Sequence, residues 1–330
     1  MAVQPLPTSE ETGQPLELEI QPTDTQRVAA RTLVVYGDSG LGKSTNLMFA
    51  AKWLYAQHGK PVRLVSAEDS SKLIFQPLID IGVVQPLFVT KSKNPLRTFR
   101  KLAAGEWPLF DAKGKAVDWQ KWDNQACAYI CEGLTSFSEQ LLEFLRENHL
   151  FLREQKADAA EVGGEKIAAA SQTAYNVAQM EMFALLKGFA NIPNIERVLW
   201  SAHEVSAVEE GTGMKMRGPA LVGSAKTPHV QKYIGTLLHC DEVTVEGVRL
   251  PRIYFVRHPD ARYPEVSYPA KVTLPPEARE LLAKTYPHGY FDPTLAVGLD
   301  SFLTAEAYAL RKATSDLAAW KKNVDSLRAS

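Results

Sequence analysis

The residues with the clearest chemistry form a short glycine-rich segment. Gly37-Asp38-Ser39-Gly40-Leu41-Gly42-Lys43-Ser44 fits the pattern G-x-x-x-x-G-K-[ST] in full. Glycines permit backbone angles that other residues resist, so successive N–H groups can point inward at phosphate oxygens. A chance glycine-rich turn is the alternative, but the motif stands between a predicted strand and a predicted helix, which is the context that a phosphate loop needs. We expect ATP phosphates to be held by Gly37, Asp38, Ser39, Gly40, Leu41, Gly42, Lys43, Ser44 and Thr45.

Three residues are candidates for binding the negative charge of the phosphates and the magnesium ion that accompanies them. Lys43 is expected to bridge the β- and γ-phosphates, and Ser44 to place its hydroxyl on Mg²⁺. The apolar segment 129–131 ends at Glu132, where P-loop proteins usually carry an Asp that supports Mg²⁺ through its water shell. Glu132 is one methylene longer, and we expect Gly133 to leave room for its reach. The alternative is an ordinary surface glutamate at the end of a strand.

A second carboxylate follows the next predicted strand, residues 62–66. Carboxyl ends of parallel strands gather at the ligand crevice, and we expect this strand to lie next to the phosphate-loop strand. Glu68 could then orient a water molecule on the γ-phosphate. Alternatively, Glu68 or Asp69 caps the helix that follows. We assign the water to Glu68 and the cap to Asp69.

The elements that position these residues alternate between strand and helix. A strand at 32–36, a helix at 43–58 and a strand at 62–66, joined by short links, predict a parallel sheet with a right-handed crossover. The strands expected further on are 88–90, 126–131, 198–202, 237–245 and 252–257, and the helices are 96–104, 135–154, 172–189 and 224–235. We therefore expect an α/β fold with a mostly parallel central sheet, helices on both faces and antiparallel strands at its C-terminal side.

Composition sets limits on the function. The 330 residues carry a formal net charge of -1, so nucleic acid could be held only by local clusters of cations. Three cysteines without metal-like spacing suit a reducing compartment. The start of the chain does not resemble a signal peptide, and no apolar run has the length of a membrane span. We expect a cytoplasmic protein without membrane contact.

Three regions are predicted along the chain. Residues 1–28 contain four prolines among polar residues, which predicts a flexible arm with a short strand at 16–20. Residues 29–275 are expected to form the ATPase domain. Residues 276–330 are expected to form a C-terminal extension that ends in an amphipathic helix.

With the phosphate loop, Ala67-Glu68 and Glu132-Gly133 in this order, the chain resembles the RecA-like family of ATPases over residues 30–275. Trp200-Ser201-Ala202-His203-Glu204 and Gly223-Ser224-Ala225-Lys226 also resemble segments of AAA-type ATPases of tailed phages, including those linked to single-strand annealing. The resemblance implies that His203 senses the γ-phosphate, because a strand-end histidine can donate a hydrogen bond whose strength changes on hydrolysis. A structural histidine bonded to backbone is the alternative.

The resemblance also implies two DNA-facing loops, at 155–170 and 206–219. The second loop carries Lys215, Met216 and Arg217, which could hold a phosphate backbone while the methionine wedges between bases. Acidic residues stand in both loops and neither has a stacking aromatic, so a solvated surface loop is the alternative. Arg97, Arg100 and Lys101 form another candidate DNA contact.

In RecA-like assemblies a cation reaches the nucleotide from the neighbouring subunit. Arg257 occupies the matching place and resembles that finger, with Arg262 and Lys271 as reserves. A surface arginine is the alternative. The resemblance therefore implies a homo-oligomer, a ring or a filament, with nucleotide between subunits.

The C-terminal segment has a heptad pattern. Leu303, Leu310, Leu317 and Val324 recur every seven residues, Ala313, Trp320 and Leu327 follow three residues later, and Glu306 interrupts the stripe. A terminal helix packed on its own domain is one interpretation. A handle for another subunit or a replication protein is the other.

These observations together predict an ATP hydrolase that uses ATP and Mg²⁺ and acts on single-stranded DNA in phage recombination or replication. The main alternative is an ATPase switch or loader that acts on a protein partner through the tail helix. A nucleotide or small-molecule kinase shares the phosphate loop, but the sequence lacks a clear arginine-rich lid.

Overall fold

The computed structural model describes residues 31–90, 92–111, 116–121, 125–148, 159–162, 165–168, 172–208, 215–221, 230, 233–260, 263, 266–293 and 298–329. Within these ranges, the side chains of 159–168, 172, 207–208, 215–216, 245, 317 and 320–329 lie outside the description. The predicted arm therefore falls outside the described residues, and so does most of the predicted helix 224–235.

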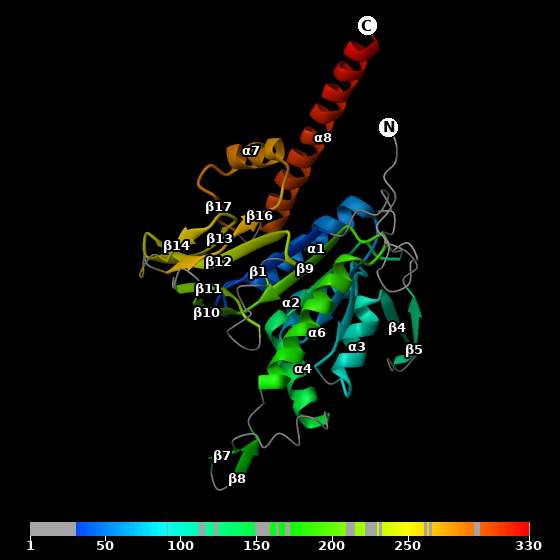
Figure 1. Cartoon of the computed structure of the whole chain (residues 1–330), viewed down its shortest axis with the longest axis vertical. Helices are drawn as coiled ribbons and strands as arrows, with labels where there is room; N and C mark the ends of the chain where they lie inside the picture. The colour runs from blue at the N-terminus through cyan, green and yellow to red at the C-terminus, as the bar shows by residue number, and fades with distance from the viewer. Residues whose placement is uncertain are drawn as a thin grey trace, which may run out of the picture.

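A nine-stranded sheet forms the centre of the molecule (Figure 1). Its order is β17 (Tyr290–Phe291), β13 (Val248–Tyr254), β12 (Thr236–Val245), β1 (Arg31–Tyr36), β9 (Arg197–Ala202), β6 (Ala128–Glu132), β2 (Val62–Ser66) and β3 (Val84–Phe88), with β16 (Lys271–Val272) also paired to β12. Neighbouring strands from β12 to β3 run parallel, whereas β12, β13 and β17 pair antiparallel. The predicted fold class, an α/β fold with a mostly parallel central sheet and antiparallel strands at the C-terminal side, is confirmed.

The predicted neighbour of the phosphate-loop strand is wrong. We expected residues 62–66 beside β1, but β9 and β6 lie between β1 and β2. β1 pairs instead with β9 and β12, for example Val34 with Trp200 and with Leu237. The crossover that contains the first helix therefore passes over two strands that are added later in the chain.

Helices cover both faces of the sheet, because side chains alternate along each central strand. Leu33 and Val35 of β1 face one core, and Val34 and Tyr36 face the other. The first face carries α1 (Lys43–His58), α2 (Ser71–Asp80), α7 (Pro276–Thr285) and α8 (Leu299–Ala329), and the second carries α3 (Pro95–Ala103), α4 (Leu134–Asn148) and α6 (Gln172–Ala190).

Three hairpins extend from this core. They are β4 (Glu106–Phe110) with β5 (Ala116–Lys121), β7 (Ala159–Val162) with β8 (Glu165–Ala168), and β10 (Glu204–Val208) with β11 (Lys215–Pro219). β10 and β11 also join β15 (Ser267–Tyr268) and β14 (His258–Pro259) in a four-stranded sheet. Where the structure describes them, the two predicted loops are therefore hairpins. These strands are held by backbone hydrogen bonds between paired strands. Backbone pairing of this kind does not require an alternating apolar pattern, so the sequence did not reveal it.

The last helix has two differently placed halves. Its first turns pack on α1 and α7, and Leu303 and Ala313 of the predicted stripe are buried. Glu306, which interrupts that stripe, is also buried and forms an ion pair with Arg197 of β9 at 2.6 Å. The C-terminal half extends beyond the rest of the molecule (Figure 1).

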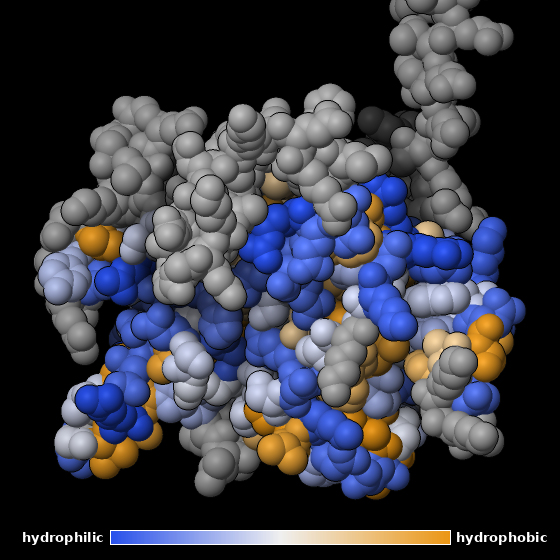
Figure 2. Space-filling view, turned by 90° about the horizontal axis from the view of Figure 1, so that it is seen from below, coloured by the Kyte–Doolittle hydropathy of each residue, from blue (hydrophilic) through white to orange (hydrophobic). Residues whose placement is uncertain are grey.

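None of the helices in the described part of the chain has the length and apolarity to cross a bilayer. On the face shown in Figure 2, hydrophobic residues form several separate patches, each bordered by hydrophilic residues.

Candidate active site

The phosphate loop leaves β1 at its carboxyl end and enters α1, as the motif predicts. Gly42 precedes α1 in the left-handed conformation, with φ 74°. Gly37 has φ +152°, and a Cβ added there would lie 2.3 Å from the carbonyl oxygen of Cys240 on β12. Glycine is therefore required at both positions, at Gly42 by backbone angle and at Gly37 by close approach to a neighbouring strand.

Lys43 is buried at the start of α1 and turns back into the loop. Its Nζ donates hydrogen bonds to the carbonyl oxygens of Gly37 at 3.0 Å and Asp38 at 2.6 Å. Burial lowers the pKa of Lys43, and the nearby carboxylates of Glu132 and Glu68 oppose that shift. The ammonium group is thus held at the mouth of the loop, where it can exchange carbonyl partners for phosphate oxygens.

Glu132 lies at the end of β6 and contacts the second residue of α1. The hydroxyl of Ser44 donates to its Oε1 at 2.5 Å. The side chain is fully buried, and burial raises its pKa to about 7, while the Ser44 hydrogen bond lowers it and the nearby Glu68 raises it. Oε2 is buried without a satisfactory hydrogen bond, although the Ser201 hydroxyl lies near enough to lower the pKa.

These residues fit a magnesium ion. Magnesium prefers oxygen ligands together with phosphates and water, and here a serine hydroxyl and a carboxylate with an unsatisfied oxygen lie together beside the phosphate loop. Ser44 would hold the ion, and Glu132 would support it. The metal role of both residues stays a prediction.

The raised pKa of Glu132 predicts a pH-dependent stability. The folded protein keeps the proton up to pH about 7, whereas an unfolded glutamate loses it near 4.5. The folded state therefore binds more protons between these values, and the free energy of unfolding falls as pH rises through this window. At ~1.4 kcal/mol per pH unit, the fall amounts to roughly 3 kcal/mol.

Glu132→Gln has no proton to lose and should remove this dependence. In denaturant titrations of the nucleotide-free and magnesium-free protein, the variant should gain stability relative to the parent from pH 5 to pH 7 and no further above pH 7.5. Parallel stability curves for the two proteins across that range would show that Glu132 is ionised in the folded state.

Glu68 reaches the same place from β2. Its Oε1 accepts a hydrogen bond from Ser136 of α4 at 3.1 Å. Gly133 has φ +89°, and a Cβ there would lie 2.6 Å from Oε1 of Glu68. We expected Gly133 to make room for Glu132, and this is wrong: the space above Gly133 is occupied by Glu68, which lies across the end of the neighbouring strand. The role of Asp69 as a cap is also not seen, because its carboxylate accepts from Thr90.

His203 is the residue after β9, the strand that lies between β1 and β6 in the sheet. Its Nε2 lies 3.5 Å from Oε1 of Glu68, and the ring is partly exposed. The backbone holds it firmly, because its N–H donates to Thr135 and its carbonyl accepts from Ala220. The structure thus brings Lys43 and Ser44 at the start of α1 together with Glu132 at the end of β6, and with Glu68 and His203, which follow β2 and β9.

No protein-family model matches the chain, and no curated protein sequence matches it. Among solved structures, the chain is similar to the flagellar accessory protein FlaH from Methanocaldococcus jannaschii, with 9% sequence identity and a TM-score of 0.36. The match covers 68% of this chain and 77% of that chain. At this TM-score the likeness adds nothing about function.

A buried polar network next to His203 was not predicted. The carboxylate of Glu204 accepts from Arg217 of β11 through Oε1 and contacts His239 of β12 through Oε2, both at 3.1 Å. The other ring nitrogen of His239 lies 2.9 Å from Nε2 of His258. Burial and the neighbouring His239 lower the pKa of His258 to about 4. Glu204 stood in the segment that resembles phage ATPases, and its position directly after His203 was the available signal.

The remaining predicted residues lie outside this cluster. Arg217 contacts Glu204 and the hydroxyl of Tyr268. Lys215 and Met216 lie in the same strand, and their side chains are outside the described residues. Arg257 is exposed and donates to Ser267, Lys271 lies in β16, and Arg262 is not described. Their DNA-binding and finger roles stay predictions.

Proposed function

We propose that this chain is an ATP hydrolase that acts on single-stranded DNA in phage recombination or replication, with nucleotide held between neighbouring subunits. The observation that supports it best is that Lys43 and Ser44 lie close to the carboxylates of Glu132 and Glu68 at the carboxyl ends of the parallel strands. A loop that holds phosphates, an acid beside its serine and a second acid nearby are the parts that hydrolysis of a triphosphate requires.

In this proposal each residue has a separate task. The loop N–H groups and Lys43 bind the phosphates and counter their charge. Magnesium, when bound, supplies further positive charge to the β- and γ-phosphates. Glu68 orients a water molecule and accepts its proton, while Ser136 fixes the carboxylate. His203 lies beside Glu68, where it can donate a hydrogen bond to a phosphate oxygen.

The DNA part of the proposal is supported by chain continuity. β10 begins at Glu204, the residue after His203, and pairs with β11, which carries Lys215 and Arg217. Measuring the ATPase rate with and without single-stranded DNA tests it, with imaging of the same samples for rings or filaments. Stimulation by single-stranded DNA is expected. An ATPase rate that does not change when DNA is added would favour the alternative, an ATPase switch or loader that acts on a protein partner.

Lys215→Ala together with Arg217→Ala should weaken binding to single-stranded DNA. Each lost phosphate contact should lower the slope of log K against log salt by about 0.7. Fluorescence anisotropy with a labelled oligonucleotide at several salt concentrations measures both effects, and Lys187→Ala on α6 is the matched control. Unchanged affinity and slope would place the DNA contact elsewhere, for example at Arg97, Arg100 and Lys101.

The subunit-interface part is tested by mixing two inactive variants. Arg257→Ala keeps its phosphate loop, and Lys43→Ala keeps its arginine finger. Because an arginine from a neighbour acts only when both subunits are docked, a mixture should recover part of the ATPase activity. No recovery, with a rate per subunit that is independent of concentration, would mean that one chain hydrolyses ATP alone.

One observation favours the alternative function, an ATPase switch or loader for a protein partner. The C-terminal half of α8 extends beyond the body (Figure 1), and its sequence continues the heptad pattern through Leu317, Val324 and Leu327. A projecting helix with an apolar stripe is a suitable contact for another protein. In that case removal of residues 314–330 should abolish partner binding and leave the basal ATPase rate unchanged.

A further inference from the structure

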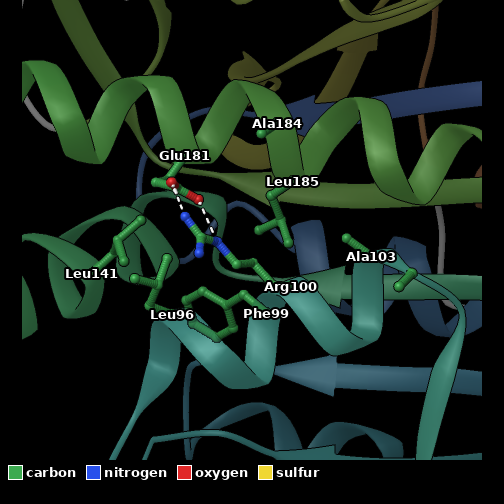
Figure 3. A pocket seen from close by; sticks show the side chains of 9 residues that line it. Leu96, Phe99, Arg100, Ala103, Leu141, Glu181, Ala184 and Leu185 are labelled. Atoms are coloured by element: carbon green, nitrogen blue, oxygen red, sulfur yellow. Dashed lines mark hydrogen bonds and ion pairs between the residues drawn. The ribbon is translucent and has the colours of Figure 1, made fainter.

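A groove lies on the face of the molecule formed by α3, α4 and α6, away from the phosphate loop. Its volume is about 370 Å³. Leu96 and Phe99 of α3, Leu141 of α4 and Leu185 of α6 give it apolar walls (Figure 3). Arg100 crosses it and donates two hydrogen bonds to the carboxylate of Glu181. The groove is thus apolar at the bottom and charged at its mouth.

The groove continues into a second hollow of about 450 Å³, which shares Leu96 and Arg100 with the first. Arg97 and Lys101 line this part. α3 carries these three cations and no acidic residue. Lys101 pairs with Glu106, whereas Arg97 makes no ion pair with any residue that the structure describes. Glu181 and Glu106 also line these hollows, so a ligand that fits here is apolar on one side and offers a carboxylate to Arg97 on the other.

The chain itself contains a segment of this kind. Residues 1–30 hold five carboxylates and one cation, Arg27, so this arm is strongly acidic. Within it, Leu16-Glu17-Leu18-Glu19-Ile20 alternates between apolar and acidic residues and is flanked by Pro15 and Pro22. In an extended conformation, alternate side chains point to opposite sides. The three apolar residues would then share one side and the two glutamates the other.

The segment can reach the groove. Arg31 is the first residue of β1 and lies at the end of this strand that is opposite to the phosphate loop. Its backbone N–H donates to the carbonyl of Glu196. The turn 191–196 joins this place to the end of α6, and Ala184 at the groove lies about 9 Å further along that helix at ~1.5 Å per residue. Residues 21–30 can span about 33 Å when extended, which is enough for residue 20 to meet the groove of its own chain.

We propose that residues 16–20 dock in the groove between α3, α4 and α6 of the same chain. Leu16, Leu18 and Ile20 lie on the apolar floor, and Glu17 and Glu19 face Arg97 and Arg100 at the mouth. The docked arm covers apolar surface and ties α3 to α6. This inference is independent of the proposed reaction with ATP.

Disulfide trapping in the full chain tests the contact. All three native cysteines, Cys127, Cys131 and Cys240, are free and buried, so mild oxidation should couple only introduced thiols. Leu18→Cys combined with Ala184→Cys should form a cross-link within one chain, seen by peptide mass spectrometry and as a monomer-sized product. The control pairs Leu18→Cys with Lys284→Cys, an exposed position on α7 at the other face of the sheet.

Three results would overturn the proposal. Equal yields from the two cysteine pairs would mean that the arm has no preferred site. Mainly dimer-sized products would mean that the groove takes the arm of a second copy. No cross-link with Ala184→Cys, in a variant with the far-ultraviolet circular dichroism of the parent, would mean that the groove does not hold residues 16–20.

Charge reversal tests the assigned orientation. Glu17→Lys with Glu19→Lys, added to the cysteine pair, should slow the cross-linking roughly fivefold at low salt. Adding Arg97→Glu should restore part of the rate, and high salt should remove the difference between the variants. A cross-linking rate that is insensitive to both changes would show that the acidic side chains do not face α3.

Discussion

Lys43→Ala is expected to lose ATP hydrolysis and to bind triphosphate roughly 100-fold more weakly, since a charged hydrogen-bond donor to phosphate is removed. Lys43 is buried, and its Nζ already points into the loop toward the carbonyl oxygens of Gly37 and Asp38. No other described cation lies in this position to replace it. Phosphate release and binding of a fluorescent ATP analogue measure the two effects.

The control for this variant is Lys52→Ala, an exposed lysine on the same helix whose ammonium lies near the ring of Phe49. It should keep both hydrolysis and affinity close to those of the parent. Normal ATPase activity in Lys43→Ala, with a parent-like melting temperature, would remove the central claim that residues 37–45 hold the phosphates.

Glu68→Gln is expected to bind ATP with magnesium about as well as the parent and to hydrolyse it roughly 100-fold to 1,000-fold more slowly. A residue that accepts a proton from water acts mainly on the chemical step, and general bases contribute on the order of 10²–10⁴. Glutamine has nearly the same shape and can still accept from Ser136, so the local structure should persist. Single-turnover hydrolysis separates the chemical step from binding.

Asp69→Asn is the matched control, because Asp69 is the next residue and contacts Thr90 at the surface. Its rate should stay within about twofold of the parent. If Glu68→Gln instead loses affinity while the rate per bound nucleotide stays normal, Glu68 is a binding residue, and the water must be oriented by another group.

The conformation of residues 37–45, from the end of β1 into the start of α1, could be predicted from sequence because it depends on local backbone angles. Gly37 and Gly42 are required by their own conformation and by one close neighbour, and such requirements appear as residue types at fixed spacing. The strand ends at Ser66 and Glu132 were also predictable, because each follows a short apolar run.

The order of the strands could not be predicted from these local patterns. Which strand lies beside β1 depends on how β9 fits between β1 and β6, and this is decided by packing of residues such as Trp200 against two helices. For the same reason the sequence suggested that Gly133 makes room for Glu132, whereas the side chain that lies over Gly133 is that of Glu68, which follows β2. The contacts of Glu204 with Arg217 and His239 likewise join side chains of three strands, β10, β11 and β12, whose relative placement depends on tertiary packing.

The ion pair between Glu306 and Arg197 bears on how the protein can be shortened. Both side chains are almost fully buried, so a chain that ends before residue 299 would keep a charged arginine inside with no counter-charge. Loss of one partner of a buried pair typically costs about 3–5 kcal/mol, a large share of the stability of an ordinary domain. The C-terminal boundary of a minimal folded chain is therefore expected beyond Ala313, the last described helix residue in the core, and shortening or a C-terminal fusion should be tolerated in the turns of α8 that follow it.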